Sequence, residues 1–443
     1  MTRRFDSAEL LDTIAADHLE DGCVSVMDRW LPVAEWMEAR LEAGFDATCK
    51  MNGSRIGPRI VGRDRGGRGI SGINFAAQDY LNLASHPRIL AAASAAGRRF
   101  GVHSAGTAVQ MGLNPLTTAL EDQLATFLRY EDATVFPSGW AAGYGAIRTL
   151  VREGDHVLID TLAHDCLREG AAASGARVHR MPHLSLQAMT SRLERLRDED
   201  PQAGILVVTE SLFATESDAP DLRALQALCK RHAATLLVDV SHDLGVLGET
   251  GRGVAEIQKM LGRIDVMVGS FSKVFAANGG FVASSHPAVK VALRLSCSTL
   301  GDSNAVSPVQ AAIVLAALEI VASEDGRERR ESLIANARHL RERLIKAGFE
   351  LRGEPGPVVT VRLGPLSRAR RLTAEVLANG ALVNLSERIG ANHATPGAAV
   401  WRLRVMAGHG PEEIDGFVDL LIECRKRLAE ADEKAFSNRF VAA

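Results

Sequence analysis

The chain has 443 residues, which is too many for one ordinary hydrophobic core, so we expect two or three structural units. Its 51 basic and 54 acidic side chains give a formal net charge of −3, which does not indicate a nucleic-acid binder or a protein for anionic membranes. The longest apolar run, residues 311–322, is too short to span a bilayer, and the first 22 residues contain no signal-peptide core. The six scattered cysteines form no CxxC pair. We therefore expect a cytoplasmic protein with neither a metal site nor a disulfide framework.

The first part of the chain predicts helices and then short strands. Residues 27–44 have the clearest helical pattern of an N-terminal arm, and the glycine- and arginine-rich stretch 53–72 predicts turns and short strands. Between 114 and 285, helical segments alternate with short β-branched runs at 133–136, 156–160, 204–210, 235–240, 264–269 and 279–284. Such alternation predicts an α/β fold with a mostly parallel sheet flanked by helices.

The last third changes character. Residues 286–345 predict helices. Short strands are predicted at 358–363, 381–385 and 401–406, before an amphipathic helix over 411–435. We divide the chain into a helical arm (1–55), a large α/β domain (56–330) and a small C-terminal α+β domain (331–443).

Two polar residues stand out because ligands of open α/β sheets bind beyond the carboxyl ends of the strands. Asp239 ends the apolar run TLLVDV, where a buried carboxylate needs a cationic partner. It serves either as a helix cap or structural ion pair, or as the carboxylate that holds a protonated ring nitrogen. Lys273 lies among serines and glycines after the next run, where partial desolvation favours a nucleophilic amine. Neighbouring serines and backbone N–H groups suit a phosphate.

Weaker signals lie upstream. The turn FPSGWAAGYGAI (136–147) places free N–H groups at a helix N-terminus, which is a ready anion site. His164 follows the strand-like run 156–160, and His242 lies three residues after Asp239. Each histidine taken alone is more often structural than catalytic.

Together these features resemble the fold-type I enzymes that use pyridoxal 5′-phosphate (PLP), and within them the α-oxoamine synthases. The resemblance extends over residues 70 to 425 and is carried by QDYLNLASHPRI, VDVSHDLGVLGETGRG, GSFSKVFAANGGFV and RLRVMAGH. It implies that Lys273 anchors PLP covalently and later moves the substrate α-proton. Asp239 would keep the pyridine nitrogen protonated, His242 would contact the ring oxygen, and His164 would stack on the ring.

The resemblance also implies further contacts with the cofactor and the substrate. The contacts with the phosphate and with the rest of the cofactor would come from Ser138, Gly139, Trp140, Glu210 and Ser270. Ser303 would contribute a further contact across a dimer. Arg404 would bind the carboxylate of the amino acid, because a guanidinium forks onto a carboxylate. Gln78 and His103 would lie on the substrate side. His103 otherwise packs beside the start of the predicted helix 114–130.

The implied reaction condenses an α-amino acid with an acyl thioester, carried by CoA or a carrier protein, with loss of carbon dioxide. The product is an α-amino ketone, and the enzyme would be a homodimer. The sequence departs from the family pattern at HSAGTAVQMG (103–112), which indicates an unusual substrate. Val240, Ala214 and Gly143 are further departures.

Two other hypotheses remain open. The first is a different PLP activity on the same scaffold, such as an aminotransferase or a carbon–carbon lyase, which RLRVMAGH and the glycine motifs disfavour. The second is a non-catalytic partner subunit, which the presence of Lys273 disfavours.

Overall fold

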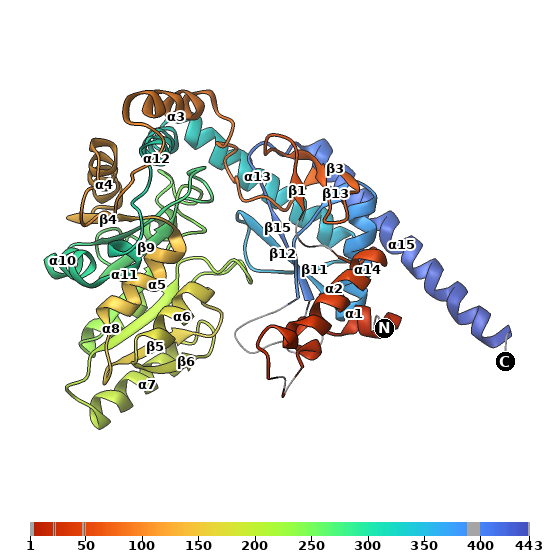
Figure 1. The fold of residues 1–443 in the computed structure, drawn as a ribbon, viewed down its shortest axis with the longest axis horizontal. Coiled ribbons are helices and arrows are strands. Elements are labelled where there is room, and N and C mark those ends of the chain that lie inside the picture. Colours follow the sequence, from red (N-terminus) through yellow and green to blue (C-terminus); the bar gives the residue numbers. More distant parts are fainter. Residues whose placement is uncertain are drawn as a thin grey trace. The chain divides into compact units, whose positions relative to one another are not determined.

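The computed structural model describes residues 4–20, 22, 24–46, 48, 50–387 and 399–441, with side chains as far as residue 433. The chain forms two compact units, one built from residues 1–77 with 334–443 and one from residues 78–333 (Figure 1). The predicted division into an arm, a large domain and a small domain stays a prediction. Four cysteines are free and buried, namely Cys166, Cys229, Cys297 and Cys424. Cys23 and Cys49 lie outside the described residues.

The unit of residues 78–333 is built around a seven-stranded sheet in the order β4-β10-β9-β8-β7-β5-β6. Its strands are β4 (Asp132–Phe136), β5 (His156–Asp160), β6 (Arg177–Met181), β7 (Ile205–Glu210), β8 (Thr235–Asp239), β9 (Val266–Ser270) and β10 (Gly280–Ser284). The strands from β9 to β6 are parallel, and β10 runs antiparallel to both β9 and β4. The predicted α/β fold with a mostly parallel sheet is therefore confirmed.

Helices surround this sheet and complete its core. They are α3 (Pro87–Phe100), α4 (Pro115–Leu128), α5 (Gly139–Leu150), α6 (Asp165–Ala173), α7 (Leu186–Glu199), α8 (Leu222–Arg231), α9 (Gly253–Ile257), α10 (Pro287–Ser296), α11 (Ser298–Gly301) and α12 (Pro308–Val321). Helix α5 packs against β9 and β10, and its Ala142, Ala146 and Ile147 are fully buried. Burial of such apolar side chains against the central strands is the main stabilising contribution to this unit.

The other unit combines both ends of the chain. Its elements are α1 (Ser7–Asp12), two short 3-10 helices η1 (Ala15–His18) and η2 (Asp28–Trp30), α2 (Leu31–Glu42), β1 (Met51–Asn52), β2 (Arg59–Arg63), β3 (Gly69–Asn74), β11 (Glu350–Arg352), β12 (Val358–Gly364), α14 (Leu366–Ala378), β13 (Ala381–Leu382), β14 (Leu385–Ser386), β15 (Ala399–Arg404) and α15 (Pro411–Val441). Helix α13 (Glu324–Lys346) runs through the boundary between the two units.

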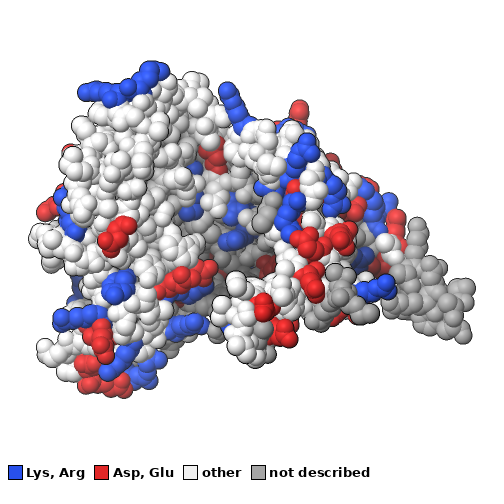
Figure 2. Space-filling view, in the orientation of Figure 1, with Lys and Arg blue, Asp and Glu red and all other residues white. Residues whose placement is uncertain are grey.

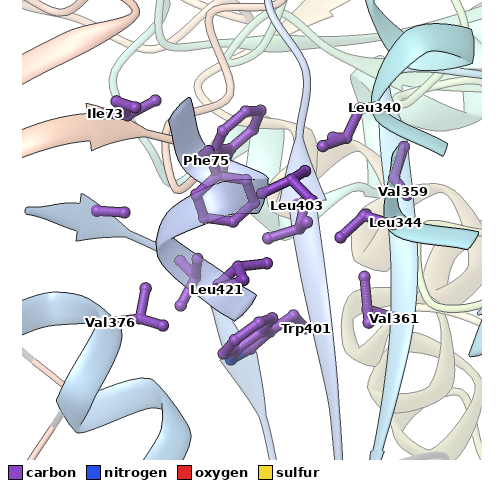
Figure 3. Close-up of a cluster of buried hydrophobic side chains, with 14 of the residues drawn as sticks. Ile73, Phe75, Leu340, Leu344, Val359, Val361, Val376, Trp401, Leu403 and Leu421 are labelled. Carbon is purple, nitrogen blue, oxygen red and sulfur yellow. The ribbon is translucent and has the colours of Figure 1, made fainter. Parts of the chain in front are cut away.

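This unit has two four-stranded sheets, β1-β2-β3-β13 and β11-β12-β15-β14. Apolar side chains from both sheets and from α13, α14 and α15 meet in one buried cluster that includes Phe75, Leu340, Val376, Trp401 and Leu421 (Figure 3). The predicted strand 381–385 is divided, because β13 pairs with β3 and β14 pairs with β15. The chain crosses from one sheet to the other at this point.

Within the N-terminal arm, helix α1 packs against α2, and it also packs against α14. Asp6 and Glu9 form a capping box at the start of α1, and the Trp36 indole N–H donates to the carbonyl of Glu9. Trp36 is fully buried and stacks on His18 at a ring distance of 4.8 Å. These contacts make the arm part of a packed unit.

Charged side chains of both signs are interspersed on the face shown in Figure 2, and basic side chains project over α3. No helix among the described residues is long and apolar enough to cross a membrane.

Candidate cofactor and substrate site

Polar residues end the central parallel strands of the unit 78–333. Asp160 ends β5, Glu210 ends β7, Asp239 ends β8 and Ser270 ends β9. Glu210 and Asp239 are register partners on neighbouring strands. Because these strands are parallel, their last side chains gather at one edge of the sheet, where ligands bind in such folds.

Two carboxyl groups lie at the centre of this edge. Asp239 is buried, and its Oδ1 accepts a hydrogen bond from the Ser241 N–H at 2.8 Å. Glu210 is also buried, and its Oε1 accepts a hydrogen bond from the His164 N–H at 2.6 Å. Burial and the charge of Asp239 raise the pKa of Glu210 well above its usual range. Burial beside Asp239 therefore favours the neutral form of Glu210.

His164 is the N-cap residue of helix α6 and is exposed. Its Nδ1 accepts a hydrogen bond from the Cys166 N–H at 3.3 Å and lies 3.1 Å from the Cys166 Sγ. Desolvation by the surrounding protein and the positive charge of Lys273 lower the pKa of His164, whereas the negative charge of Asp239 raises it by less. The ring is therefore neutral with its proton on Nε2. Trp140 meets it edge-on at a ring distance of 5.8 Å.

Lys273 lies in the loop between β9 and β10. The Phe271 N–H donates to the Gly279 carbonyl, which closes this loop, and Phe271, Val274 and Phe275 are buried. Buried neighbours on both sides fix the backbone that presents the lysine. Its charge lowers the pKa values of both His164 and Glu210, so the amine lies near the carboxyl ends of the central strands.

His242 lies in the loop after β8. Its Nδ1 is 3.1 Å from the hydroxyl of the fully buried Tyr80. The next residue, Asp243, is completely buried and accepts hydrogen bonds from the Ser211 hydroxyl and the Val254 N–H. Burial raises the pKa of Asp243 to about 7, which those hydrogen bonds only partly offset. Asp243 therefore holds the loop that carries Asp239 and His242.

The predicted phosphate turn sits against β9. Ser138 begins α5, and its hydroxyl accepts a hydrogen bond from the Ala141 N–H at 3.0 Å. The first N–H groups of the helix, at Gly139 and Trp140, have no partner inside the helix and suit an anion. A Cβ at Gly139 would lie 2.4 Å from the Cβ of Ser270. Ser270 Oγ in turn lies 2.7 Å from Ser272 Oγ.

This set of groups fits PLP. A helix N-terminus with two serine hydroxyls suits the phosphate, a buried strand-end carboxylate suits the pyridinium nitrogen, and one lysine amine suits the aldehyde. The close approach of Gly139 to Ser270 explains why the turn needs glycine, since a Cβ there would overlap the side chain of Ser270.

The predicted substrate residues fall in different places. Arg404 ends β15 in the other unit, and its side chain is buried, at 5% exposed. Its Nη1 donates to the Ala76 carbonyl at 3.1 Å. Gln78 begins the unit 78–333, and its carbonyl accepts from the Tyr80 N–H.

His103 and Ser303 belong to two loops that touch. His103 Nε2 lies 3.4 Å from the Asn304 amide, and Ala305 donates its N–H to the Gly106 carbonyl. The HSAGTAVQMG stretch is thus tied to the loop of Ser303 through Asn304 and Ala305. The substrate role of His103 and the phosphate role of Ser303 stay predictions.

The sequence did not identify two parts of this edge. Tyr80 lies inside the quoted motif QDYLNLASHPRI, but the sequence assigned it no role. His183 bridges Asp160 and Asp218, with ring nitrogens 2.9 and 3.0 Å from their carboxylates. A lone histidine between two distant aspartates leaves no local signal.

Comparison with known proteins places the chain in a family. Residues 70–421 match the family model described as aminotransferase class I and II. The 8-amino-7-oxononanoate synthase of Citrifermentans bemidjiense is 33% identical over 79% of this chain and 88% of its own length. The 8-amino-7-oxononanoate synthase of Geobacter metallireducens is 35% identical, again over 79% of this chain and 88% of its own length. The serine palmitoyltransferase of Sphingomonas wittichii superposes with a TM-score of 0.84 at 27% identity, covering 91% of this chain and 99% of its own.

A further solved relative, a serine palmitoyltransferase from S. paucimobilis, contains a bound PLP–myriocin aldimine and superposes with a TM-score of 0.84 at 27% identity, covering 91% of this chain and 99% of its own. The fold and the strand-end site define a fold-type I enzyme with PLP as its cofactor. The chain belongs to the class I and II aminotransferase family and, within it, to the α-oxoamine synthases.

Proposed function

We propose that this enzyme condenses an α-amino acid with an acyl thioester, on CoA or a carrier protein, and releases an α-amino ketone, carbon dioxide and a thiol. The observation that carries this proposal is the convergence of Lys273, Asp239 and His164 at the carboxyl edge of the parallel sheet. Relatives named 8-amino-7-oxononanoate synthase and serine palmitoyltransferase support it.

The chain's own residues would divide the work as follows. Ser138, Gly139, Trp140 and Ser270 would hold the phosphate through hydroxyl and backbone N–H groups. The buried Asp239 would pair with the protonated pyridine nitrogen, beside Glu210, whose pKa burial and the charge of Asp239 raise. When bound, PLP supplies an aldehyde carbon for the amino acid and an electron sink for the carbanion formed beside it.

Lys273 would hold the cofactor covalently and, after the amino acid displaces it, take the α-proton with its Nζ. The neutral His164 ring would lie on the cofactor face with Nε2–H free to donate, because Nδ1 already accepts from Cys166. His242, fixed by Tyr80, would donate to the ring oxygen. Arg404 would bind the carboxylate of the amino acid by a charge-assisted pair.

Three further statements belong to this proposal. The enzyme would act as a homodimer in which Ser303 reaches the partner's phosphate, and Gln78 and His103 would lie toward the substrate. A cytoplasmic location remains the expectation. The departures at 103–112 favour a substrate that differs from those of the relatives.

The test is a reaction with purified holoenzyme. Amino acids are screened for a change in the visible absorbance of the bound cofactor. Responding amino acids are then mixed with acyl thioesters while free thiol and carbon dioxide are measured. Lys273→Ala should abolish both products and the visible band of the lysine-linked cofactor. Transfer of the amino group to a keto acid without thiol release would instead identify an aminotransferase.

A further inference from the structure

His183 joins two loops at the carboxyl edge of the seven-stranded sheet. It follows β6, and its Nδ1 lies 2.9 and 3.1 Å from the two carboxylate oxygens of Asp160, which ends β5. Its Nε2 lies 3.2 and 3.0 Å from the carboxylate oxygens of Asp218, in the loop after β7. The ring of Phe213 meets the imidazole edge-on at 4.7 Å. One side chain thus links the segments that follow β5, β6 and β7.

The first of these loops carries His164. Asp160 Oδ1, which faces His183, also accepts a hydrogen bond from the Leu162 N–H at 2.8 Å. Two residues further on, the His164 N–H donates to Glu210 Oε1 at 2.6 Å. The turn between β5 and α6 is therefore held by one carboxyl group at each end, and His183 holds the carboxylate at its start.

The second loop follows β7. The Phe213 N–H donates to the Asp218 carbonyl at 2.9 Å, so this loop closes on itself beside His183. At its start, the Ser211 N–H donates to the carbonyl of Asp239 at 2.9 Å. His183 is therefore joined through Asp218 to the loop whose first residue is bonded to the strand-end Asp239.

The charge of the imidazole suits this position. Asp160 is buried, and His183 and Asp218 are partly buried. Burial lowers the pKa of His183, but hydrogen bonds to the two carboxylates and their charges outweigh burial and raise it to about 9. Loss of this cation would leave two partly buried carboxylates without their shared partner, and each would then seek water or another donor.

We propose that His183 is a positioning residue of the cofactor site, which through Asp160 sets the turn that places the His164 ring on the cofactor face. This inference rests on the proposed function, in which His164 stacks on the cofactor. His164 is exposed, so the position of its ring depends on this turn and on its contact with Cys166 more than on packing. His183 itself would touch neither cofactor nor substrate.

The test uses the holoenzyme and needs no substrate. Hydroxylamine attacks the aldehyde carbon of the bound cofactor, frees the lysine amine and removes PLP as its oxime. A His164 ring that lies on the cofactor hinders this attack, and a displaced ring hinders it less. We expect His183→Asn to raise the rate of cofactor removal by about 3- to 10-fold. Asp218→Asn keeps the pair of His183 with Asp160 and should raise the rate by a smaller factor, in a less perturbed protein.

A double-mutant cycle shows whether His183 acts through His164. In the His164→Ala background, His183→Asn should change the rate by less than about 1.5-fold, because no ring remains to be displaced. Hydrogen exchange of the holoenzyme gives a readout that does not involve the cofactor chemistry. The N–H groups of Leu162 and His164 should exchange about 10-fold faster in His183→Asn.

His179→Asn is the matched control. His179 lies on β6, the strand that precedes His183, and its Nε2 lies 3.0 Å from Nδ1 of His156 at the start of β5. Its replacement removes a partly buried histidine contact between the same two strands, but away from the turn that carries His164. We expect neither cofactor removal nor hydrogen exchange at His164 to change in this variant.

Unchanged rates of cofactor removal in both His183→Asn and Asp218→Asn would overturn the proposal, and so would an equal acceleration in His179→Asn. An effect of His183→Asn that persists in full without the His164 ring would also overturn it, because His183 would then act by another route. None of these measurements uses a thioester. A holoenzyme that shows the expected effects but consumes no thioester would contradict the condensation and support the role of His183, and the reverse result would do the opposite.

Discussion

His409, the last residue of RLRVMAGH, is a structural residue. Its Nδ1 accepts a hydrogen bond from the Met406 N–H at 3.0 Å, and its Nε2 donates to the Asn74 carbonyl at 3.1 Å. The ring is 2% exposed and stacks on Phe75 at 4.4 Å. It therefore joins the ends of β3 and β15, close to Arg404, without being placed to react.

Burial lowers the pKa of His409 to about 4. Since an unfolded histidine titrates near 6.5, the stability that the neutral ring contributes is present above about pH 6.5 and is lost as pH falls toward 4. We expect His409→Gln to cost about 2 kcal/mol of unfolding free energy at pH 7 and to flatten the loss between pH 6.5 and 4. Urea unfolding at several pH values measures both effects, and an unchanged acid limb would contradict this assignment.

The bridge of His183 gives the opposite pH dependence. Burial alone would lower the pKa of His183, but hydrogen bonds to Asp160 and Asp218 outweigh burial and raise it to about 9. The stability from this bridge is therefore full below about pH 6.5 and is lost as pH rises through 9. We expect His183→Asn to lower the unfolding free energy by about 2 kcal/mol at pH 6 and by much less at pH 9.5. A loss that does not depend on pH would show that the charge of His183 is unimportant.

Single residues could be predicted from sequence where the chemistry requires a rare residue at a strand end. Asp239 and Lys273 are polar groups after apolar runs, and the structure brings both to the same edge of the sheet. Tyr80 and His183 were missed for another reason. Their partners lie 162, 23 and 35 positions away along the chain, and only the folded structure makes them neighbours.

At the scale of elements, strands with continuous apolar runs were predicted within a residue or two. The sequence did not predict strand β6, because RVHRM is polar. The strand lies at the edge of the sheet and is mostly exposed, so it needs no continuous apolar run. Helix α7 was also missed, and only three of its side chains are buried, so its apolar pattern is weak. The split of 381–385 into β13 and β14 depends on which sheet each half joins, and a short apolar run does not encode that choice.

The turn before α5 depends on a glycine with no room for a side chain. We expect Gly139→Ala to force its Cβ against Ser270, to weaken PLP binding by at least about 10-fold and to cost about 1–3 kcal/mol of unfolding free energy. Cofactor titration and thermal unfolding measure these effects.

Gly416→Ala in α15 is the matched control, because its added Cβ meets no atom within 4 Å and alanine favours a helix. It should leave PLP binding unchanged and raise stability by about 0.5–1 kcal/mol. If Gly139→Ala bound PLP as tightly as the unchanged enzyme, the phosphate would not bind at this turn.

At the scale of the whole molecule, the main surprise is that the N-terminal arm belongs with the C-terminal third. Strand β13 pairs with β3 across about 300 residues of chain, and Arg370 on α14 binds the arm. The sequence predicted an arm over 1–55 but did not indicate its docking site, because Arg370 cannot be told from the neighbouring surface arginines of α14 by sequence alone.

Arg370 is the centre of that docking site. Its Nη1 donates to the carbonyls of Leu10, Leu11 and Thr13, and its other nitrogens bind Glu387. The side chain is 1% exposed, so its replacement leaves three carbonyls and a carboxylate, all buried or partly buried, with fewer donors. We expect Arg370→Met to cost about 3–5 kcal/mol of unfolding free energy and to release the arm.

Limited proteolysis with trypsin checks this, since Arg29 and Arg40 offer cleavage sites inside the arm and Arg40 is buried in the folded unit. Cleavage at Arg40 should become rapid in Arg370→Met and stay slow in Arg371→Met, whose arginine pairs with Asp432 on α15 instead. Slow cleavage at Arg40 in Arg370→Met would mean that the arm is held mainly by Trp36 and not by the arginine.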